Sequence, residues 1–380
     1  MTFMKKQRVL ILALAVVALG TVFVTLSTRG LADSNAITFE APTYHPGSPN
    51  GQDGWSSLGS AGLGGCAAYD HQIVNNVLFA PPPTFGSQSL RISDAVTSGC
   101  FGDQTFSKSL VNEAGETNAQ SSPFSGGVRQ SHFEAQFDVT STMLAQQAGM
   151  LLSISPDRGD GARMSYVRLE DGAAGIDVIF ADYQDAAPFG SLVVPAAGCG
   201  AEDDFIQTPI ATGLSRSVPH KIKFVIDFVN GARNDVVKIY IDGNLVHTGT
   251  TWEDYFRWCA ESGGGVVETT PVNDVSRTVD SLLFRTAGDA HLSHLGNGYL
   301  FDNLSLLSSR PPTSKDDCKN GGWQTRTTTS GKPFKNQGQC IDFVEDQKDK
   351  DNDKKDNDDK DKKDKDDKKD KDDKGDKHDH

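Results

Sequence analysis

Residues 219–250, PHKIKFVIDFVNGARNDVVKIYIDGNLVHTGT, carry the clearest structural signal in this chain. Apolar and polar residues alternate in two runs, with apolar positions at Ile222, Phe224, Ile226 and Phe228, and again at Val237, Ile239 and Ile241. Alternation with period two predicts two strands, each with one face on a core. Asn230-Gly231 ends the first run, and Asp242-Gly243-Asn244 turns the chain into a third strand, Leu245–Thr248. A meander needs a second sheet to cover its apolar face, so this stretch predicts a β-sandwich.

Strand signals of the same kind recur along the chain, at spacings of roughly ten residues. They fall at Ala36–Glu40, Val77–Phe79, Gln88–Ser93, Gln104–Leu110, His132–Val139, Gly149–Ser155, Arg163–Glu170, Ile176–Tyr183, Val279–Arg285 and Gly298–Leu307. Asp254–Trp258 is compatible with a single helical turn, and no long helix is expected. The pattern predicts an all-β fold, an antiparallel two-sheet jelly-roll sandwich that spans residues 33–309.

The N-terminus has the features of an export signal. Lys5, Lys6 and Arg8 precede an apolar run from residue 9 to residue 26, and small residues follow at Gly30 and Ala32. This pattern predicts a signal peptide over residues 1–32. The alternative is an uncleaved anchor, because 18 apolar-leaning residues are just enough to span a bilayer. Both alternatives predict an exported chain, secreted or at the cell surface, and cleavage would leave no membrane span.

The C-terminus divides into two segments. Residues 310–344 begin with a Pro-rich linker, Arg310-Pro311-Pro312, and continue as a segment of about thirty residues with two cysteines. A unit this small needs a covalent staple to fold alone, so a disulfide-containing mini-module is expected. Residues 345–380 consist almost entirely of Lys and Asp, and this composition predicts a disordered tail.

Charge argues against one class of partner. The formal net charge is −14, and the basic residues form no patch or stripe. Nucleic-acid-binding proteins neutralise phosphates with clustered Lys and Arg. No nucleic-acid partner is therefore expected.

The cysteines indicate disulfide bonds. All of them follow the predicted signal peptide: Cys66, Cys100, Cys199, Cys259, Cys318 and Cys340. An even count in an exported chain favours disulfides, although six cysteines allow fifteen connectivities. Sequential pairing is the simplest prediction, and the absence of Cys-x-x-Cys spacing argues against a zinc or redox site.

Several of these segments resemble known families. The strand HFEAQFDV (132–139), the hairpin VVKIYIDGNLV (236–246) and the closing YLFDNLSL (299–306) resemble the concanavalin A-like lectin/glucanase superfamily, which includes laminin-G-type modules. Segments such as GQDGW (51–55) are similar to a group of exported bacterial proteins, and residues 316–344 resemble a two-cysteine segment at the C-termini of such proteins. The resemblance implies a jelly-roll fold and supplies no activity.

No catalytic motif accompanies that resemblance. Laminarinase-type members of the superfamily carry Glu-x-Asp-x-x-Glu on one strand, and this spacing is absent. The nearest arrangement is Glu134 and Asp138, but residues four apart on a strand lie roughly 13 Å from each other. That separation is too large for either glycosidase geometry. Whether the chain is an enzyme stays open, and the balance favours a non-catalytic protein.

A structural calcium ion is one candidate ligand. Carbohydrate-binding jelly rolls often hold Ca²⁺ between their first and last strands, and the resemblance implies the same place here. Glu40 ends the first expected strand and Asp302 lies in the last. Carboxylate oxygens are the hard ligands that Ca²⁺ prefers. The alternative is a pair of ordinary carboxylates at strand ends.

A sugar site is the other candidate. Aromatic faces stack on the apolar C–H patches of pyranose rings, and polar groups fix the orientation. The densest group of this kind is Trp252, Tyr255, Arg257 and Trp258, and Tyr166 and Arg168 share a strand face that could line the same sheet. The alternative is that the Trp residues only plug one end of the sandwich.

Three functional hypotheses follow. The first is an exported, non-catalytic binding module that recognises a glycan or a cell-wall polymer. The second is a structural surface or matrix protein, in which the 345–380 tail contacts the wall. The third, which has the least support, is a divergent polysaccharide hydrolase or lyase. The sequence does not specify the sugar, the disulfide connectivity or the oligomeric state.

Overall fold

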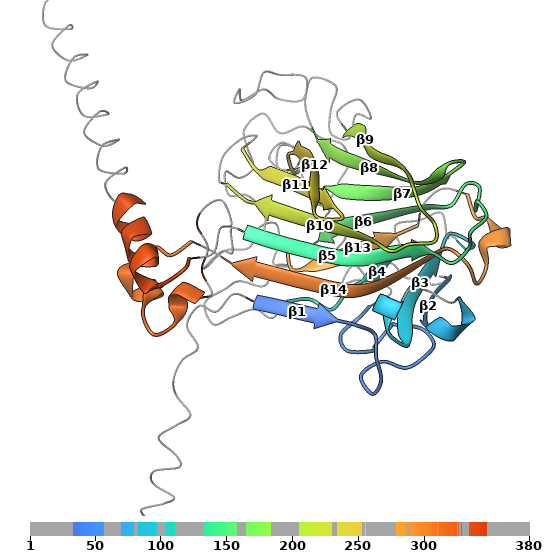
Figure 1. Cartoon of the computed structure of the whole chain (residues 1–380), viewed down its shortest axis with the longest axis horizontal. Coiled ribbons are helices and arrows are strands. Elements are labelled where there is room, and N and C mark those ends of the chain that lie inside the picture. Colours follow the sequence, from blue (N-terminus) through green and yellow to red (C-terminus); the bar gives the residue numbers. More distant parts are fainter. Residues whose placement is uncertain are drawn as a thin grey trace, which may run out of the picture.

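The structure is a computed structural model with two antiparallel sheets and a small C-terminal unit (Figure 1). It describes residues 33–56, 70–79, 83–96, 104–110, 132–157, 165–183, 205–229, 234–252, 255, 279–286, 289–309, 311–324, 326, 328 and 334–347. Every strand pairing among these residues is antiparallel. The predicted two-sheet, all-β class is confirmed.

The larger sheet has the order β12-β11-β10-β5-β14-β3-β2, and β1 also pairs with β14. Its strands are β1 (Asp33–Ile37), β2 (Asp70–Asn75), β3 (Gln88–Ser93), β5 (His132–Ser141), β10 (His220–Asp227), β11 (Val236–Ile241), β12 (Asn244–Gly249) and β14 (Tyr299–Ser309). β3 and β1 share one edge of β14, because β3 pairs with its first residues and β1 with its last. The chain thus begins and ends its sandwich on neighbouring strands.

The smaller sheet has the order β4-β13-β6-β7-β8-β9. Its strands are β4 (Gln104–Phe106), β6 (Leu151–Asp157), β7 (Tyr166–Gly172), β8 (Gly175–Tyr183), β9 (Phe205–Leu214) and β13 (Ser281–Arg285). Short 3₁₀ helices connect strands of the sandwich at η1 (Asn76–Leu78), η2 (Pro83–Phe85) and η4 (Leu292–His294).

The core lies where alternation predicted it. Ile222, Phe224 and Ile226 of β10 are fully buried. Residues directly opposite in a sheet point to the same face, so the partners of Phe224, Ala135 and Ile239, extend this apolar face. Aromatic rings then join the two sheets. Phe301 of β14 packs edge-on against Phe137 of β5 and Phe284 of β13, with ring centroids 5.7 and 5.1 Å away.

Some strand predictions were wrong in place or kind. Residues 77–79 were expected to form a strand but mostly belong to η1 and its C-cap, and Val77 and Leu78 are 86% and 71% exposed. The first strand covers Asp33–Ile37 rather than Ala36–Glu40, because Phe39 adopts a left-handed conformation with φ +55°. β2 and β9 were not predicted.

β9 escaped prediction for a physical reason. Its sequence, FIQTPIATGL, has no apolar alternation and contains Pro209. Proline cannot donate to a sheet ladder and is tolerated mainly on edge strands. β9 is the terminal strand of the smaller sheet, so its outer edge needs no donor there.

The C-terminal unit is built as expected around a disulfide. It contains η5 (Lys315–Cys318), η6 (Gly322–Gln324) and a helix over residues 337–347. Cys318 and Cys340 form the predicted bond, and both are fully buried beside Phe334 and Val344. The helix continues three residues past the expected boundary at residue 344. In the part of the chain that the structure describes, no helix combines the length and apolarity needed to cross a bilayer.

Candidate functional site

Five aromatic side chains gather at one end of the smaller sheet. We call them the aromatic cluster: Tyr166 of β7, Tyr183 of β8, Phe205 of β9, and Trp252 and Tyr255, which follow β12. Their ring centroids lie 4.7 to 6.3 Å apart in contacting pairs, mostly edge to face. Such pairs add roughly 0.5–1.5 kcal/mol each beyond burial.

The cluster extends from the hydrophobic core to the outer face of the smaller sheet: Tyr183 and Trp252 are members of the core, and Tyr166, Phe205 and Tyr255 pack against it. Val167 and Leu169 of β7 belong to the core, so Tyr166, Arg168 and Glu170 point to the other face. Within the cluster, Tyr166, Phe205 and Tyr255 are half-buried. Trp252 is only 8% exposed, and its Nε1 donates to the Ala181 carbonyl over 3.4 Å. Trp252 therefore backs the partly exposed rings.

Two arginines lie beside the cluster on the same face. Register places Ser153 of β6 between Arg168 of β7 and Arg285 of β13, so the three side chains form one row across the sheet. The Arg168 Nε donates to Glu170 Oε1 over 2.6 Å, which orients this guanidinium along the strand. The face thus combines aromatic edges with forked cationic donors.

The structure brings together part of the predicted sugar site. Tyr166, Trp252 and Tyr255 meet, and Arg168 lies on the same face two residues along β7. Arg257 and Trp258 lie outside the described residues. The ligand-binding role of all six residues stays a prediction.

Sequence reasoning missed three members of this face. Tyr183 stood in a predicted strand and Arg285 in another, but nothing in the sequence shows that they share a face with Tyr166. Register supplies that information, through pairs such as Tyr183 with Phe205. Phe205 opens β9, which lacks a strand signal, so no local pattern marked it.

The predicted calcium ligand Glu40 is held by β3. Its carboxylate accepts hydrogen bonds from the backbone N–H groups of Ser87 and Gln88, over 2.6 and 3.2 Å, and from the Ser87 hydroxyl. Burial tends to raise the pKa of Glu40, but these hydrogen bonds outweigh it and lower the pKa overall. Gly86 has φ +58°, and a Cβ there would lie 2.2 Å from Glu40 Oε1, so a larger residue would have to displace this carboxylate.

The second predicted ligand, Asp302, lies where β14 changes partner from β3 to β1. It is 1% exposed, faces Asp138 of β5 in register, and its Oδ1 accepts the N–H of Asn303 over 2.8 Å. Burial, together with the negative charges of Glu40 and Asp138, raises the pKa of Asp302 to about 8 despite that hydrogen bond. The surroundings of Asp302 therefore disfavour its charged form, and a bound cation would favour that form.

The residues present fit a hard cation in part. Asp302 supplies a buried oxygen donor close to two other carboxylates, which is the environment that Ca²⁺ relieves. Glu40, by contrast, already accepts three hydrogen bonds, and a calcium ion would have to share or displace them. Asp302 is the stronger of the two candidate ligands.

The outer face of the larger sheet carries a different kind of surface. A depression of about 260 Å³ crosses β1, β14, β5 and β10; its lining is polar and aliphatic, without an aromatic ring. Glu134 on its floor is ion-paired, with Oε2 2.7 Å from Lys223 Nζ and Oε1 3.3 Å from His132 Nε2. Asp138 pairs with Lys221 over 3.0 Å. These carboxylates therefore cross-link strands β5 and β10.

The remaining predicted cysteine pairs cannot be placed. Cys66, Cys100, Cys199 and Cys259 lie outside the described residues. Their sequential pairing stays a prediction.

Comparison with known proteins leaves the family open. No family model matches the sequence, and no curated protein matches it. The finer assignment to the concanavalin A-like superfamily thus remains a prediction.

Solved structures with similar chain courses include carbohydrate-related proteins. Alginate lyase Aly36B is 13% identical, with 73% of this chain and 97% of that chain covered and a TM-score of 0.37. The binding domain of Paraclostridial Mosquitocidal Protein 1 is 10% identical, with 80% and 56% covered and a TM-score of 0.35. Domain 4 of AbnA, a GH43 extracellular arabinanase from Geobacillus stearothermophilus in complex with arabinotriose, is 12% identical, with 73% and 94% covered and a TM-score of 0.26. Similarities this weak assign neither an activity nor a ligand to this chain.

Proposed function

We propose that this chain is an exported binding module that recognises a glycan on the outer face of its smaller sheet. The supporting observation is the position of three half-buried aromatic rings, Tyr166, Phe205 and Tyr255, beside the Arg168 guanidinium. The export half of the proposal rests on residues 1–32, whose pattern is that of a signal peptide.

The chemistry of this face suits a sugar polymer. Partly exposed aromatic rings offer apolar surface to the C–H face of a pyranose. Arg168 and Arg285 offer several N–H donors in a fixed fork, which match vicinal hydroxyls and carboxylates. A uronic-acid polymer would use both features, whereas a neutral glycan would use mainly the rings.

The buried members of the aromatic cluster give the face its rigidity. Trp252 is fixed by its bond to Ala181 and by ring contacts to Phe205 and Tyr166 at 4.7 and 5.9 Å. A pre-ordered face loses little side-chain entropy when a ligand binds. Trp252 thus contributes through position rather than contact.

The proposal also includes a structural calcium ion at Asp302. Asp302 lies at the junction of β3, β1 and β14, so an ion there would tie the first and last strands of the sandwich together. This role would stabilise the fold without touching the aromatic face.

The proposal is tested by binding of the full chain to a polysaccharide panel containing neutral and uronic-acid polymers. Tyr166→Ala and Arg168→Gln should each weaken binding about tenfold or more, since each removes a direct contact. Tyr240→Ala is the matched control, because Tyr240 lies on β11 in the other sheet. If no polymer binds, the structural surface-protein hypothesis replaces this one. If Tyr240→Ala weakens binding as much as Tyr166→Ala, the site is misplaced.

A further inference from the structure

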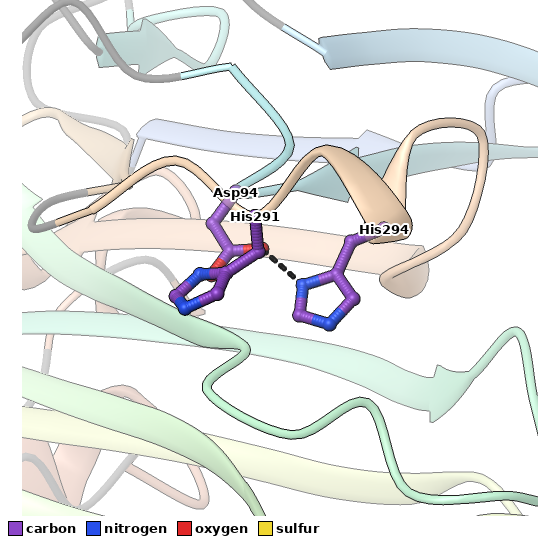
Figure 2. Close-up of side chains that lie close together, drawn as sticks. All are labelled: Asp94, His291 and His294. Atoms are coloured by element: carbon purple, nitrogen blue, oxygen red, sulfur yellow. Dashed lines mark hydrogen bonds and ion pairs between the residues drawn. The ribbon is translucent and has the colours of Figure 1, made fainter.

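Two histidines and one aspartate converge at the end of the sandwich where β3 finishes and β14 begins (Figure 2). Asp94 directly follows β3, and His291 and His294 flank and end the 3₁₀ turn η4. Asp94 Oδ2 lies 2.8 Å from His291 Nδ1, and Asp94 Oδ1 lies 2.6 Å from His294 Nδ1. One ligand atom from each residue lies within 4.8 Å of the others.

The backbone around these side chains is tightly held. The His291 N–H donates to the Asp94 carbonyl over 3.0 Å, and the His294 N–H donates to the His291 carbonyl over 2.8 Å. On the far side of the turn, Asp70 accepts the N–H of Gly296 over 3.0 Å, and Arg91 donates to the Asn297 carbonyl over 3.0 Å. The three side chains are therefore pre-positioned by two separate clamps.

The two nitrogens of the His291 ring have different neighbours, Asp94 at Nδ1 and Gly149 near Nε2. A Cβ built on Gly149 would lie 2.6 Å from His291 Nε2, so this edge of the ring rests against the Gly149 backbone. Gly149 has φ +91°, a conformation that other residues rarely adopt. The opposite nitrogen, Nδ1, consequently faces Asp94.

Burial gives the group a closed back and an open front. The side chains of Asp94 and His294 are 1% and 6% exposed, while that of His291 is 35% exposed. The two rings stack with centroids 5.2 Å apart and planes 30° apart. Among the three side chains, only that of His291 is therefore open to solvent.

We propose that Asp94, His291 and His294 form a binding site for a divalent transition-metal ion, with Zn²⁺ as its reference ligand. Nδ1 of each histidine and one oxygen of Asp94 are the donors. Zn²⁺ binds such atoms at about 2.0–2.2 Å, which sets ligand atoms roughly 3.3 Å apart in a tetrahedron. In the structure the two Nδ1 atoms lie against different oxygens of Asp94, at 2.8 and 2.6 Å, and one ligand atom from each residue lies within 4.8 Å of the others. Binding through one Asp94 oxygen therefore needs a turn of the carboxylate and small shifts of the two rings.

The proton balance of this binding step is simple. In the metal-free site the two Nδ1–H groups donate to Asp94. When the metal takes the Nδ1 lone pairs, each neutral imidazole carries its single proton on Nε2 instead, by exchange with solvent. Any histidine that is protonated beforehand releases one proton to solvent when the metal binds.

The donor set indicates the class of metal. Two imidazole nitrogens and one carboxylate suit Zn²⁺, Ni²⁺, Cu²⁺ or Fe²⁺, whereas Ca²⁺ and Mg²⁺ prefer oxygen ligands alone. Three protein ligands leave a coordination position for water or for an outside ligand. The site differs in chemistry from the carboxylates around Asp302.

The site also differs in place from the proposed glycan face. Met150, next to Gly149, accepts the N–H of Asp171 near the end of β7. Tyr166 begins the same strand, and the five-residue separation corresponds to roughly 17 Å. Metal binding and glycan binding can therefore be tested independently.

The experiment titrates the chelator-treated full chain with Zn²⁺ by calorimetry and with Co²⁺ by visible absorption. The expected result is one Zn²⁺ per chain and a Co²⁺ d–d band of low-symmetry N/O coordination. His291→Gln, at the half-exposed position, should lower Zn²⁺ affinity at least tenfold and abolish the band. Asp94→Asn should act in the same direction. His45→Gln is the matched control, because His45 is exposed and lies outside the group.

Two results would overturn the site. One is an absence of Zn²⁺ binding to the unaltered chain. The other is equal affinity and an identical Co²⁺ spectrum in the unaltered chain and in His291→Gln, which would assign the metal to the Asp- and His-containing residues 345–380. His294→Gln is a further test of the site. If this variant fails to fold, His291→Gln still decides, because the His291 side chain is the most exposed of the three.

Discussion

His132 of β5 stands directly opposite Asp227 of β10, and its Nδ1 lies 2.7 Å from Asp227 Oδ1. Its other nitrogen, Nε2, lies 3.3 Å from Glu134 Oε1. Burial alone would lower the pKa of His132, but the hydrogen bonds and charges of Asp227 and Glu134 outweigh it and raise the pKa above its ordinary value. The buried His132 ring thus links β5 to β10 through Asp227, while Glu134 of its own strand contacts the other nitrogen.

The stability of the sandwich should therefore decline as the pH rises past neutrality. A histidine with a raised folded-state pKa contributes fully below its unfolded pKa of about 6.5 and loses that contribution as the pH rises through the folded value. His132→Gln should flatten this decline. Urea unfolding between about pH 6 and pH 9 measures it. Equal slopes in the variant and the unaltered chain would remove His132 as the cause, and His45→Gln serves as the control.

His71 should make the protein less stable as the pH falls, which is opposite to the effect of His132. Its Nδ1 contacts the Thr105 hydroxyl in the other sheet. Burial and the charge of Arg91 lower its pKa to about 4, against the opposing effect of Asp70. The unfolded chain then binds the extra proton first, so stability falls as the pH drops from about 6.5 to 4.

The pKa shift of His71 limits how much stability the protein can lose in acid. At about 1.4 kcal/mol per pKa unit, the shift of His71 from 6.5 to about 4 accounts for about 3–4 kcal/mol at most. His71→Gln should make unfolding midpoints less dependent on pH between 4 and 6.5, measured by urea titration. A steeper acid dependence in the variant would contradict the assignment.

Trp252 should contribute to the folding stability of the smaller sheet. Trp252→Ala removes a buried side chain from the aromatic cluster and should cost about 3–5 kcal/mol of unfolding free energy. Tyr240→Ala, on the outer face of the other sheet, should cost under about 1 kcal/mol. Denaturant unfolding compares the two. A small cost for Trp252→Ala would show that the cluster does not order this end of the sheet.

Calcium should raise the melting temperature through Asp302. Thermal unfolding of the full chain with Ca²⁺ and then with chelator measures the effect, and Asp302→Asn should abolish the difference. In chelator, Asp302→Asn should be the more stable protein at neutral pH, because the raised pKa makes Asp302 take up a proton when the chain folds, a cost that Asn does not carry. A calcium effect that survives in Asp302→Asn would place the ion elsewhere.

The C-terminal unit should depend on its disulfide. Replacing Cys318 and Cys340 by Ser releases a 22-residue separation, which corresponds to about 3 kcal/mol of stabilisation. Its few apolar contacts cannot offset that loss. Protease cleavage within residues 311–347 should become fast in the double variant. The sandwich should keep its melting temperature, and a large fall there would show that the two units are coupled.

Strands could be predicted where one face meets the core. The sequences of β5, β10 and β11 alternate between apolar and polar residues because one face of each strand meets the core, and their positions followed from that pattern. β9 lies at an edge, contains a proline and has no buried residue, so its sequence shows no apolar alternation. Val77 and Leu78 were wrongly expected to lie in a strand because they are apolar, although both side chains are exposed.

The candidate sites depend on register and on contacts distant in sequence. Tyr166 and Arg168 could be placed on one face because they lie on one strand. Asp94 and His291 are separated by 197 residues, and a His-x-x-His spacing at 291–294 has no meaning until the aspartate is beside it. Such pairs exist only after strands have paired, which the sequence alone does not state.

The shared edge of β14 also decides how the molecule would be presented from an attachment point. Asp33 pairs with Ser308, so the chain enters and leaves the sandwich at the same end (Figure 1). Tyr299 begins β14 at the opposite end, roughly 33 Å away, close to the turn that carries His291 and His294. A tether through either terminus would therefore hold the near end against its support. The rim with the two histidines would face outward, toward whatever approaches from solution.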